Sequence, residues 1–374
     1  MKIRAAVLHE MKLEAPYAIS QPLKIEQLEL DAPKYGEVLV QIKATGLCHS
    51  DLSVINGSRP RVMPMALGHE AAGIVVETGE GVTDLKPGDH VVCSFVPSCG
   101  HCLPCQEGRP ALCEPGAQSN TAGTLLSGER RLHAGNQEIH HHLGVSGFAE
   151  YAVIARNSLV KVDPDVPFEQ VALFGCAVMT GVGAVINTAR VEAGSTVAVV
   201  GLGGVGLSAL LGAVVAGARR IVAVDLNPNK LELAKQLGAT DVFDSRDPET
   251  VQKIRAATNG GVDYAFETAG AVPAMQVAYQ ITRRGGTTVT TGLPDPSHQF
   301  SFPQVTLTAE ERTIKGSYVG SCVPSRDIPR YIELFKQGRL PVDRILTGTV
   351  SLEELNEGFD RLHKGEASRI VMVL

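Results

Sequence analysis

The chain has 374 residues, of which 44% are hydrophobic and 20% are charged, and its net charge is −6. This length is enough for two or three domains, and the composition is that of an ordinary globular protein. The negative charge argues against nucleic acid and against an acidic membrane surface as partners. The first residues, MKIRAAVLHEMKLEAP, hold no apolar run long enough for a signal peptide. We therefore expect a cytoplasmic protein whose thiols stay reduced.

Residues 1–175 are predicted to be rich in β-strands. Short apolar runs such as GEVLVQIKATG and AAGIVVETG are interrupted by turn residues, as at Lys86-Pro87-Gly88-Asp89. Residues 320–374 offer two helices, RDIPRYIELFKQG and LEELNEGFDRLHKG, and a final strand, RIVMVL. This tail is too short for a domain of its own, so we expect it to join residues 1–178 in one domain.

A cluster of four cysteines lies inside this β-rich part, in the run CGHCLPCQEGRPALC. The spacing C-x2-C-x2-C-x7-C of Cys99, Cys102, Cys105 and Cys113 is typical of a closed site that holds zinc through four thiolates. An iron–sulfur cluster is an alternative, because C-x2-C-x2-C also opens ferredoxin motifs. A disulfide knot is the third interpretation, and the expected reducing environment argues against it. The histidine run at residues 140–142 is not expected to be a metal site, because three adjacent side chains cannot all face one ion.

From Gly194 onward, short buried strands alternate with helices. The predicted strands are TVAVVG, RRIVAVDL, DVFD, VDYAFETAG and GGTTVTTG, and the predicted helices are VGLSALLGAVVAGA, PNKLELAKQLGA and VPAMQVAYQITRR. This alternation predicts a parallel doubly wound sheet over residues 179–319. The uncharged stretch Val197 to Ala218 is as long as a membrane span. Four glycines within six residues favour a strand, a turn and a buried helix there instead.

The glycines from Gly201 to Gly206 form the pattern G-x-G-x-x-G between a predicted strand and a predicted helix. This is the dinucleotide-binding fingerprint, in which the backbone of Gly201, Gly203, Gly204, Val205 and Gly206 would receive a pyrophosphate. Asp225 ends the next strand, 19 residues after Gly206, where a carboxylate binds ribose hydroxyls and repels a 2′-phosphate. We therefore expect NAD rather than NADP. Lys230 is a further candidate for the ribose, although a solvated helix lysine explains it nearly as well.

Three more candidate metal ligands lie far apart in the chain and are each close to a glycine. They are Cys48 in GLCHSDL, His69 in LGHEAAG and Cys176 in FGCAVMTGVGA. Each could be a buried thiol or a hydrogen-bonded imidazole, but two cysteines and one histidine can also hold a catalytic zinc with one open position. Spacing alone does not establish that the three converge.

With these motifs in this order, the chain resembles the medium-chain zinc-dependent alcohol dehydrogenases almost from end to end, and in particular their longer liver-type branch. The resemblance implies a GroES-like β-rich catalytic domain, residues 1–178 and 320–374, and a Rossmann coenzyme domain, residues 179–319. It implies two zinc ions per chain: a structural one on the four clustered cysteines, and a catalytic one on Cys48, His69 and Cys176, with Glu70 behind it. Asp51 would orient His69, and members of this branch are commonly dimers.

The resemblance also implies a reaction, the NAD-dependent oxidation of primary alcohols to aldehydes and its reverse. The alcohol would take the open zinc position, lose its proton because the cation lowers its pKa, and transfer a hydride to the nicotinamide. Ser50 would start the proton relay. His49, Arg369, Thr180 and Leu293 match positions that contact the coenzyme, and Phe95 matches one that lines the substrate pocket.

Two departures from the family pattern limit the assignment. Ser53 stands where many liver-type members carry the histidine that ends the relay. The glutathione-dependent formaldehyde branch carries an acidic residue near the substrate entrance, and the corresponding segment Gly57-Ser58-Arg59-Pro60-Arg61 has none. That branch also carries an arginine just after the structural-zinc cysteines, and the corresponding segment Glu114-Pro115-Gly116-Ala117 has none. S-hydroxymethylglutathione dehydrogenase is therefore the second hypothesis. An NAD-binding sensor or structural protein without turnover is the third, and the retained zinc ligands argue against it.

Overall fold

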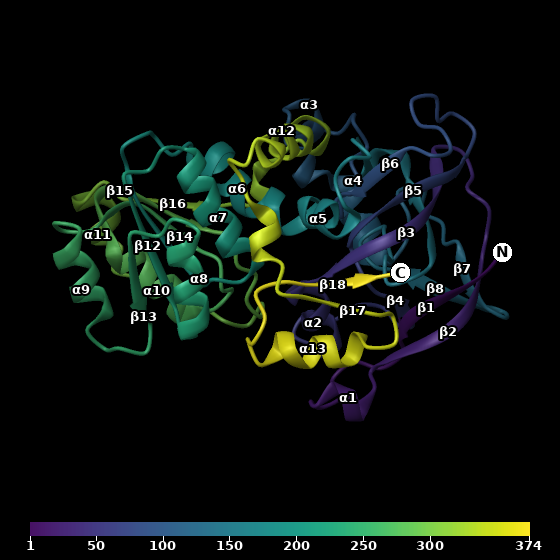
Figure 1. The fold of residues 1–374 in the computed structure, drawn as a ribbon, viewed down its shortest axis with the longest axis horizontal. Helices are drawn as coiled ribbons and strands as arrows, with labels where there is room; N and C mark the ends of the chain where they lie inside the picture. The colour runs from purple at the N-terminus through teal and green to yellow at the C-terminus, as the bar shows by residue number, and fades with distance from the viewer. The chain divides into compact units, whose positions relative to one another are not determined.

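The computed structural model describes all 374 residues, and they form two compact units, most of whose helices and strands are labelled in Figure 1. The first unit contains residues 1–176, 323–332 and 346–374, and the second contains residues 177–322 and 333–345. The domain limits expected from the sequence stay a prediction. The compact units differ from them mainly because residues 333–345 group with the second unit.

A closed β-barrel forms one part of the first unit. Its strands, in spatial order, are β1 (Lys2–Leu8), β2 (Leu23–Leu30), β7 (Leu132–Ala134), β8 (Gln137–His141) and β4 (Met65–Ala66). Alternate residues of β1 serve different cores: Ile3, Ala5 and Val7 pack in one buried cluster, and Ala6 and Leu8 pack in another. This is the period of two that a β-strand imposes on its side chains.

A larger sheet forms the other part of the first unit. Its strands, in order, are β10 (Leu159–Val162), β6 (His90–Cys93), β5 (Glu70–Thr78), β3 (Glu37–Leu47), β18 (Ile370–Val373) and β17 (Gly348–Val350), with β9 (Tyr151–Ala155) also paired to β3. The final strand β18, yellow in Figure 1, pairs antiparallel with β3, so that Ile370 lies opposite Leu47. The end of the chain therefore returns to the β-rich part, as its apolar sequence suggested.

The helices of the first unit are short and cover this sheet and barrel. They are α1 (Tyr17–Ser20), α2 (His49–Ile55), α3 (Leu103–Gln106), α4 (Glu114–Ala122), α5 (Phe168–Leu173) and α13 (Leu355–His363), and α12 (Pro324–Lys336) starts in this unit. Helix α13 buries Leu355, Phe359 and Leu362, which recur at helical spacing. Its Asp360 accepts hydrogen bonds from the backbone of Tyr17 and Ala18 at 2.6 and 2.9 Å.

The second unit is the predicted doubly wound domain. Its sheet has the order β13 (Asp241–Asp244), β12 (Arg220–Asp225), β11 (Thr196–Val200), β14 (Val262–Glu267), β15 (Thr282–Thr290) and β16 (Thr313–Gly316), and all pairs are parallel. The helices are α6 (Met179–Gly183), α7 (Gly204–Val215), α8 (Pro228–Gln236), α9 (Thr250–Ala257), α10 (Val272–Ile281) and α11 (Val305–Ala309). All five residues of β11 are buried, as expected of a central strand covered on both faces.

One predicted boundary in this unit is wrong. The helix VPAMQVAYQITRR was expected to continue through Arg284, but α10 ends at Ile281 and β15 begins at Thr282. The hydroxyl of Thr282 donates to the carbonyl of Ala278 at 2.8 Å, and Gly285 follows with φ +70°. A β-branched residue followed by glycines disfavours further helix, so the chain turns into the strand.

A long apolar helical run joins α5 to α6. The helical run Phe168–Ala189 is long and apolar enough to cross a membrane, judged by length and composition alone. However, 83% of its most apolar part is buried inside the protein. The run contains two π-helical segments, Phe174–Val178 and Ala184–Ala189. The stretch that the sequence had singled out, Val197 to Ala218, instead forms β11, a glycine turn and the buried helix α7, as predicted.

A buried ion pair connects the first residue of β3 to the barrel. Arg131 donates to both carboxylate oxygens of Glu37 at 2.8 and 2.9 Å, and both side chains are at most 3% exposed. The backbone N–H of Lys34 and the hydroxyl of Ser127 donate to the same carboxylate at 2.9 and 3.0 Å. All of these donors satisfy the Glu37 carboxylate, but only Arg131 neutralises its charge.

We predict that Arg131→Ala destabilises the protein by about 3–5 kcal/mol, because it leaves the Glu37 carboxylate buried without a counter-charge. The free energy of unfolding, measured by denaturant titration, tests this. The matched control is Arg130→Ala, since Arg130 pairs at 3.0 Å with Glu138, which is 56% exposed, and such pairs contribute about 1 kcal/mol or less. Equal losses in the two variants would contradict the assignment.

Candidate catalytic, metal and cofactor sites

The separate cysteine and histidine motifs meet at one buried point in the first unit. The ligand atoms of Cys48, His69, Glu70 and Cys176 all lie within 4.8 Å of one another, and all four residues are buried. Cys48 follows β3 and His69 immediately precedes β5, while Cys176 comes from the π-helical segment after α5. The sheet pairs Gly46 of β3 with Glu70 of β5, which brings the two loops together.

Local backbone features explain how these residues reach their positions. Cys48 is the N-cap of α2: its sulfur accepts the N–H of Ser50 at 3.5 Å, and its own N–H donates to the carboxylate of Asp51 at 3.3 Å. Gly68 has φ +91°, and a Cβ there would lie 2.4 Å from the backbone nitrogen of Phe148. Gly175 packs with equal closeness, since its Cβ would lie 2.3 Å from the carbonyl oxygen of Cys93. Glycine is thus required beside both His69 and Cys176.

His69 is oriented by Asp51, as expected. The imidazole Nδ1 lies 3.1 Å from a carboxylate oxygen of Asp51, and neither side chain is exposed. Burial alone would raise the pKa of Asp51, but the neighbouring imidazoles of His69 and His142 outweigh it and hold the pKa well below its usual range. The carboxylate therefore stays charged and holds the Nδ1 proton, which leaves Nε2 as the atom that can bind a metal.

The donor set around His69 fits a metal ion. Nε2 of His69 is buried and has no hydrogen-bond partner in the protein, which is costly unless an ion or ligand takes it. The sulfurs of Cys48 and Cys176 lie 4.0 Å apart. Their contact is the main reason why the pKa of Cys48 falls well below its usual value and that of Cys176 rises. A cation between the two sulfurs would replace the proton that they share.

Glu70 and Arg369 form a buried pair behind this cluster. Nε of Arg369 donates to Glu70 at 3.1 Å, its Nη2 contacts the other carboxylate oxygen, and its Nη1 donates to the carbonyl of Leu47 at 3.0 Å. Burial is the main reason why the pKa of Glu70 rises to about 7, and Arg369 opposes that rise. The expected contact of Arg369 with a coenzyme pyrophosphate stays a prediction, since its guanidinium is held by Glu70 here.

One buried histidine at this site was missed from the sequence. His142 places its Nδ1 3.1 Å from the same Asp51 oxygen that holds His69, and the two imidazole rings lie edge to face with centroids 5.5 Å apart. His141 faces another way, where its Nε2 accepts the backbone N–H of Arg131 at 3.1 Å. The three histidines therefore do not face one ion, but the third of them contacts Asp51 and His69. Only the fold of the loop after β8 could reveal that.

The remaining predicted residues of this region differ in their surroundings. Ser50 is half-buried, and its hydroxyl has no partner within the chain, so it is available to a substrate. The hydroxyl of Ser53 donates back to the carbonyl of His49 at 2.7 Å, and His49 itself is exposed at the start of α2. The ring of Phe95 lies edge to face with His69 at a centroid distance of 5.1 Å.

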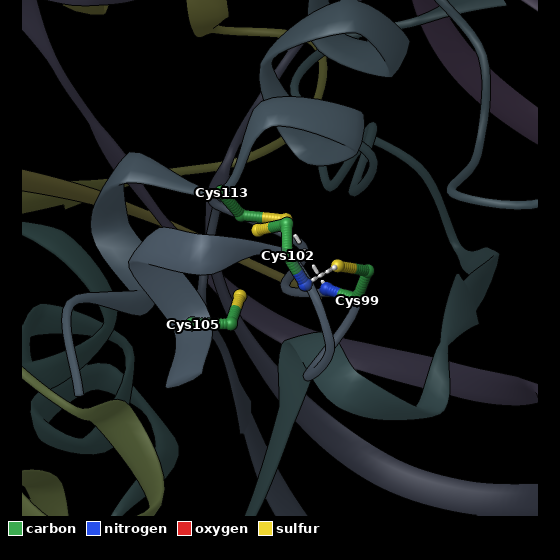
Figure 2. A group of neighbouring side chains, drawn as sticks. All are labelled: Cys99, Cys102, Cys105 and Cys113. Atoms are coloured by element: carbon green, nitrogen blue, oxygen red, sulfur yellow. Dashed lines mark hydrogen bonds between the residues drawn. The ribbon is translucent and has the colours of Figure 1, made fainter. Parts of the chain in front are cut away.

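The four clustered cysteines also converge, in a separate part of the first unit. Figure 2 shows the sulfurs of Cys99, Cys102, Cys105 and Cys113 turned toward one another, and all of them lie within 4.8 Å. Cys102 caps α3, Cys105 lies within it, and Cys113 caps α4. No disulfide links any of the eight cysteines in this structure.

Backbone donors around this cluster favour thiolates. The N–H of Cys102 donates to the sulfur of Cys99 at 3.3 Å, and the N–H of Cys99 donates to that of Cys113 at 3.2 Å (Figure 2). The N–H of Gly116 also donates to the sulfur of Cys113, at 3.4 Å. Burial pushes the pKa of Cys99 upward, but the backbone donors outweigh it and bring the pKa to about 7. Burial raises the pKa of Cys105 to about 12. Only a cation would let all four sulfurs ionise together.

The glycine motif in the second unit has the geometry of a phosphate cradle. Gly201 has φ +97°, and a Cβ on Gly206 would lie 1.8 Å from the carbonyl oxygen of Gly201, so turn and packing require both. Gly203 is different: its φ is −76°, and its Cβ would meet nothing within 4 Å. Neither conformation nor packing explains a glycine there, but a ligand that approaches the backbone does. Helix α7 begins at Gly204 and Val205 without a side-chain cap, which leaves its N–H groups for an anion.

Asp225 lies beside this cradle, at the carboxyl end of β12. Its carboxylate accepts the N–H groups of Leu202 and Asn227 at 2.6 and 2.8 Å. Lys230 is half-buried in the first turns of α8. Thr180 lies in α6, whose Gly181 would place a Cβ 2.2 Å from the carbonyl of Val205, so α6 touches the start of α7. Leu293 follows β15 and is 44% exposed, next to Gly270.

Comparison with known proteins identifies the family of the chain. The family of alcohol dehydrogenase GroES-like domains matches residues 34–164, and the family of zinc-binding dehydrogenases matches residues 204–337. An alcohol dehydrogenase class-3 from Drosophila melanogaster is 41% identical over 367 residues, which cover 96% of this chain and 97% of that protein.

Two solved structures extend this likeness to the whole fold. An alcohol dehydrogenase zinc-binding domain protein from Burkholderia ambifaria has a TM-score of 0.94 at 36% identity, over 100% of this chain and 99% of that one. Benzyl alcohol dehydrogenase from Acinetobacter calcoaceticus has a TM-score of 0.93 at 35% identity, with the same coverage. The predicted combination of a GroES-like part and a Rossmann part is confirmed. The chain therefore belongs to the medium-chain zinc-dependent alcohol dehydrogenases, and it is an oxidoreductase that uses zinc and NAD(H).

Proposed function

We propose that the protein oxidises primary alcohols to aldehydes with NAD, and catalyses the reverse reduction. The observation that carries this proposal is the buried cluster of Cys48, His69 and Cys176, in which the unpartnered Nε2 of His69 faces two sulfurs. A half-buried serine hydroxyl lies two residues after the first of these ligands. Three protein ligands, rather than four cysteines, are typical of a zinc site that keeps a position open for substrate.

The two groups of converging side chains are the proposed ligands of two zinc ions. We propose that Cys48, His69 and Cys176 hold the catalytic ion, with Glu70 as a further buried carboxylate, and that Cys99, Cys102, Cys105 and Cys113 hold the structural one. When bound, zinc supplies a Lewis acid for an alcohol oxygen, and NAD supplies the hydride acceptor. The buried surroundings strengthen these electrostatic effects, because little water screens them.

Ser50 is the group that we assign to the substrate proton. Its hydroxyl is free to accept the alcohol proton and pass it on, and it is attached to the same N-terminal turn of α2 that Cys48 caps. Ser53 lies one turn later, where its own proton is donated to the carbonyl of His49. We therefore propose that the relay leaves through Ser50 and the coenzyme ribose or water, and that Ser53 is not an obligatory member.

The proposed coenzyme site lies at the start of α7 and the end of β12. We propose that the N–H groups at the start of α7, from Gly203 to Gly206, receive the pyrophosphate and that Asp225 and Lys230 receive the adenosine ribose. His49, Thr180, Leu293 and Arg369 are proposed to contact the remaining parts of the coenzyme. We also propose that the protein is a cytoplasmic homodimer, as the liver-type resemblance suggests.

Substrate choice has one serious alternative. The class-3 relative supports S-hydroxymethylglutathione, whereas the benzyl alcohol dehydrogenase supports an aromatic alcohol. The segment 57–61 carries Arg59 and Arg61 and no acidic residue, and this favours a plain primary alcohol over the glutathione adduct. A spectrophotometric panel of alkanols, benzyl alcohol and S-hydroxymethylglutathione, followed by NADH formation, tests the proposal. The highest kcat/KM is expected for a plain alcohol; a preference for the adduct would replace it, and no turnover would favour a sensor.

The purified protein should contain two zinc ions per chain, and Cys105→Ser should lose one of them together with stability, because a closed zinc site contributes folding energy. Elemental analysis and thermal unfolding measure both effects. The control is Cys93→Ala, since Cys93 is buried outside either metal group. Iron with sulfide, or a Cys105→Ser protein that keeps two zinc ions, would refute the structural-zinc assignment.

Removal of the Ser50 hydroxyl should lower kcat by about 10²–10⁴-fold, the usual contribution of a positioned proton-transfer group. Zinc content and NADH affinity should remain as in wild type, which separates this effect from damage to the site. Ser53→Ala is the matched control on the next turn of α2, and we expect it to change kcat by less than about threefold, since its hydroxyl serves a backbone carbonyl. A large loss in Ser53→Ala instead would place it in the relay.

Replacement of Asp225 by Ser should narrow the preference for NAD over NADP, because the carboxylate that repels a 2′-phosphate is removed. The ratio of kcat/KM for the two coenzymes, measured at constant ionic strength, is the readout. The thermal midpoint should be recorded alongside, since Asp225 also holds the N–H groups of Leu202 and Asn227. An unchanged ratio would show that discrimination lies elsewhere.

A further inference from the structure

A second carboxylate and an arginine lie next to Asp225, and the proposed coenzyme contacts do not use them. Strands β12 and β13 are parallel neighbours in which Asp225 pairs with Asp244. The N–H of Ser245 donates to the carbonyl of Asp225 at 3.1 Å, so this pairing continues past the strand end. Neighbouring strands are about 4.8 Å apart, and paired residues point to the same face of a sheet. Two acidic residues thus occupy paired positions at the strand ends where the adenosine ribose is proposed to bind.

The two carboxylates have different partners. Asp225 is held by backbone N–H groups alone, which leaves its charge uncompensated. Asp244 is paired with Arg246, whose Nη2 and Nε lie 2.5 and 3.0 Å from its two oxygens. The backbone N–H of Arg246 donates to the same carboxylate at 2.9 Å. Hydrogen bonds from Arg246 are the main cause that lowers the pKa of Asp244 to about 2, so this carboxylate is charged throughout the working pH range.

The pair can exchange partners easily. Arg246 is 63% exposed and Asp244 is 37% exposed, and β13 is the edge strand of its sheet. Exposed ion pairs contribute little free energy, because water already solvates both charges. A guanidinium binds a phosphate dianion in two-point fashion, and a nearby arginine is the usual partner of the 2′-phosphate of NADP. In this structure Asp244 occupies the guanidinium of Arg246, and Asp225 adds a second carboxylate at the end of the neighbouring strand.

We propose that Asp244 is a second determinant of coenzyme choice, and that Arg246 is a latent receptor for the 2′-phosphate of NADP which Asp244 keeps occupied. This inference rests on the proposed coenzyme site at Gly203 and Asp225. It goes beyond it by assigning the preference for NAD to two carboxylates and by naming the cation that would reverse it. Loss of Asp225 alone leaves Arg246 paired, so it should change the preference only in part.

The test uses the full chain and two probes for the adenosine end, 5′-AMP and 2′,5′-ADP, in calorimetric titrations at constant ionic strength. These probes need neither zinc nor turnover. Asp244→Asn should raise the affinity for 2′,5′-ADP about tenfold, the size of one charge-assisted hydrogen bond, and leave that for 5′-AMP unchanged. Adding Arg246→Ala to this variant should abolish the gain. Asp244→Ser, a second variant that frees the same arginine, should reproduce it.

The matched control is Asp247→Asn, which removes one carboxylate close by without freeing Arg246. Asp247 pairs instead with Lys253, at 2.5 Å. We expect no gain from this control. The proposal is overturned if Asp244→Asn gives no gain, if the gain survives Arg246→Ala, or if Asp247→Asn gives the same gain. Wild type that fails to bind 5′-AMP would instead overturn the coenzyme site itself, and with it this inference.

Discussion

The burial of charge beside an apolar core is the constraint on which the first unit depends. Asp51, His69, Glu70 and Arg369 are all at most 3% exposed, and an unpaired charge at such a depth is strongly unfavourable. Each is therefore paired: Asp51 with His69, and Glu70 with Arg369. These pairs involve the ends of β3, β5 and β18, so a strand from the last residues of the chain is needed to complete a site that begins at residue 48.

Two kinds of metal site follow from two kinds of local geometry. The four clustered cysteines come from one loop and two short helices, and their own turns supply the N–H donors that favour thiolates. Such a site is closed by sequence neighbours. The other site takes one ligand from each of three distant segments, and its unpartnered imidazole nitrogen faces two sulfurs. Three protein donors leave room for a substrate, which four thiolates do not.

In the second unit, the glycine motif and Asp225 form the proposed coenzyme site. Gly201 and Gly206 are required by the backbone and by packing, whereas a Cβ on Gly203 would meet nothing within 4 Å, which is consistent with the proposed pyrophosphate contact. Asp225 accepts the N–H of Leu202 and so joins the glycine turn to the next strand, and we propose that the same carboxylate binds the ribose. We propose that the choice between coenzymes depends on a few charges at the ends of β12 and β13, where exposure keeps each interaction weak.

Local chemistry was readable from the sequence, because the four-cysteine spacing, the glycine turn and the alternation of strands and helices involve residues close together in the chain. Family resemblance added the fold, which is confirmed, and the proposed catalytic ligand set. Spacing could not place Cys48 beside His69 and Cys176, since only sheet pairing and the π-helical segment unite them. Sequence spacing also gives no sign that His142 contacts Asp51 or that Asp225 pairs with Asp244. Contacts between distant segments depend on packing and register, which the tertiary structure alone decides.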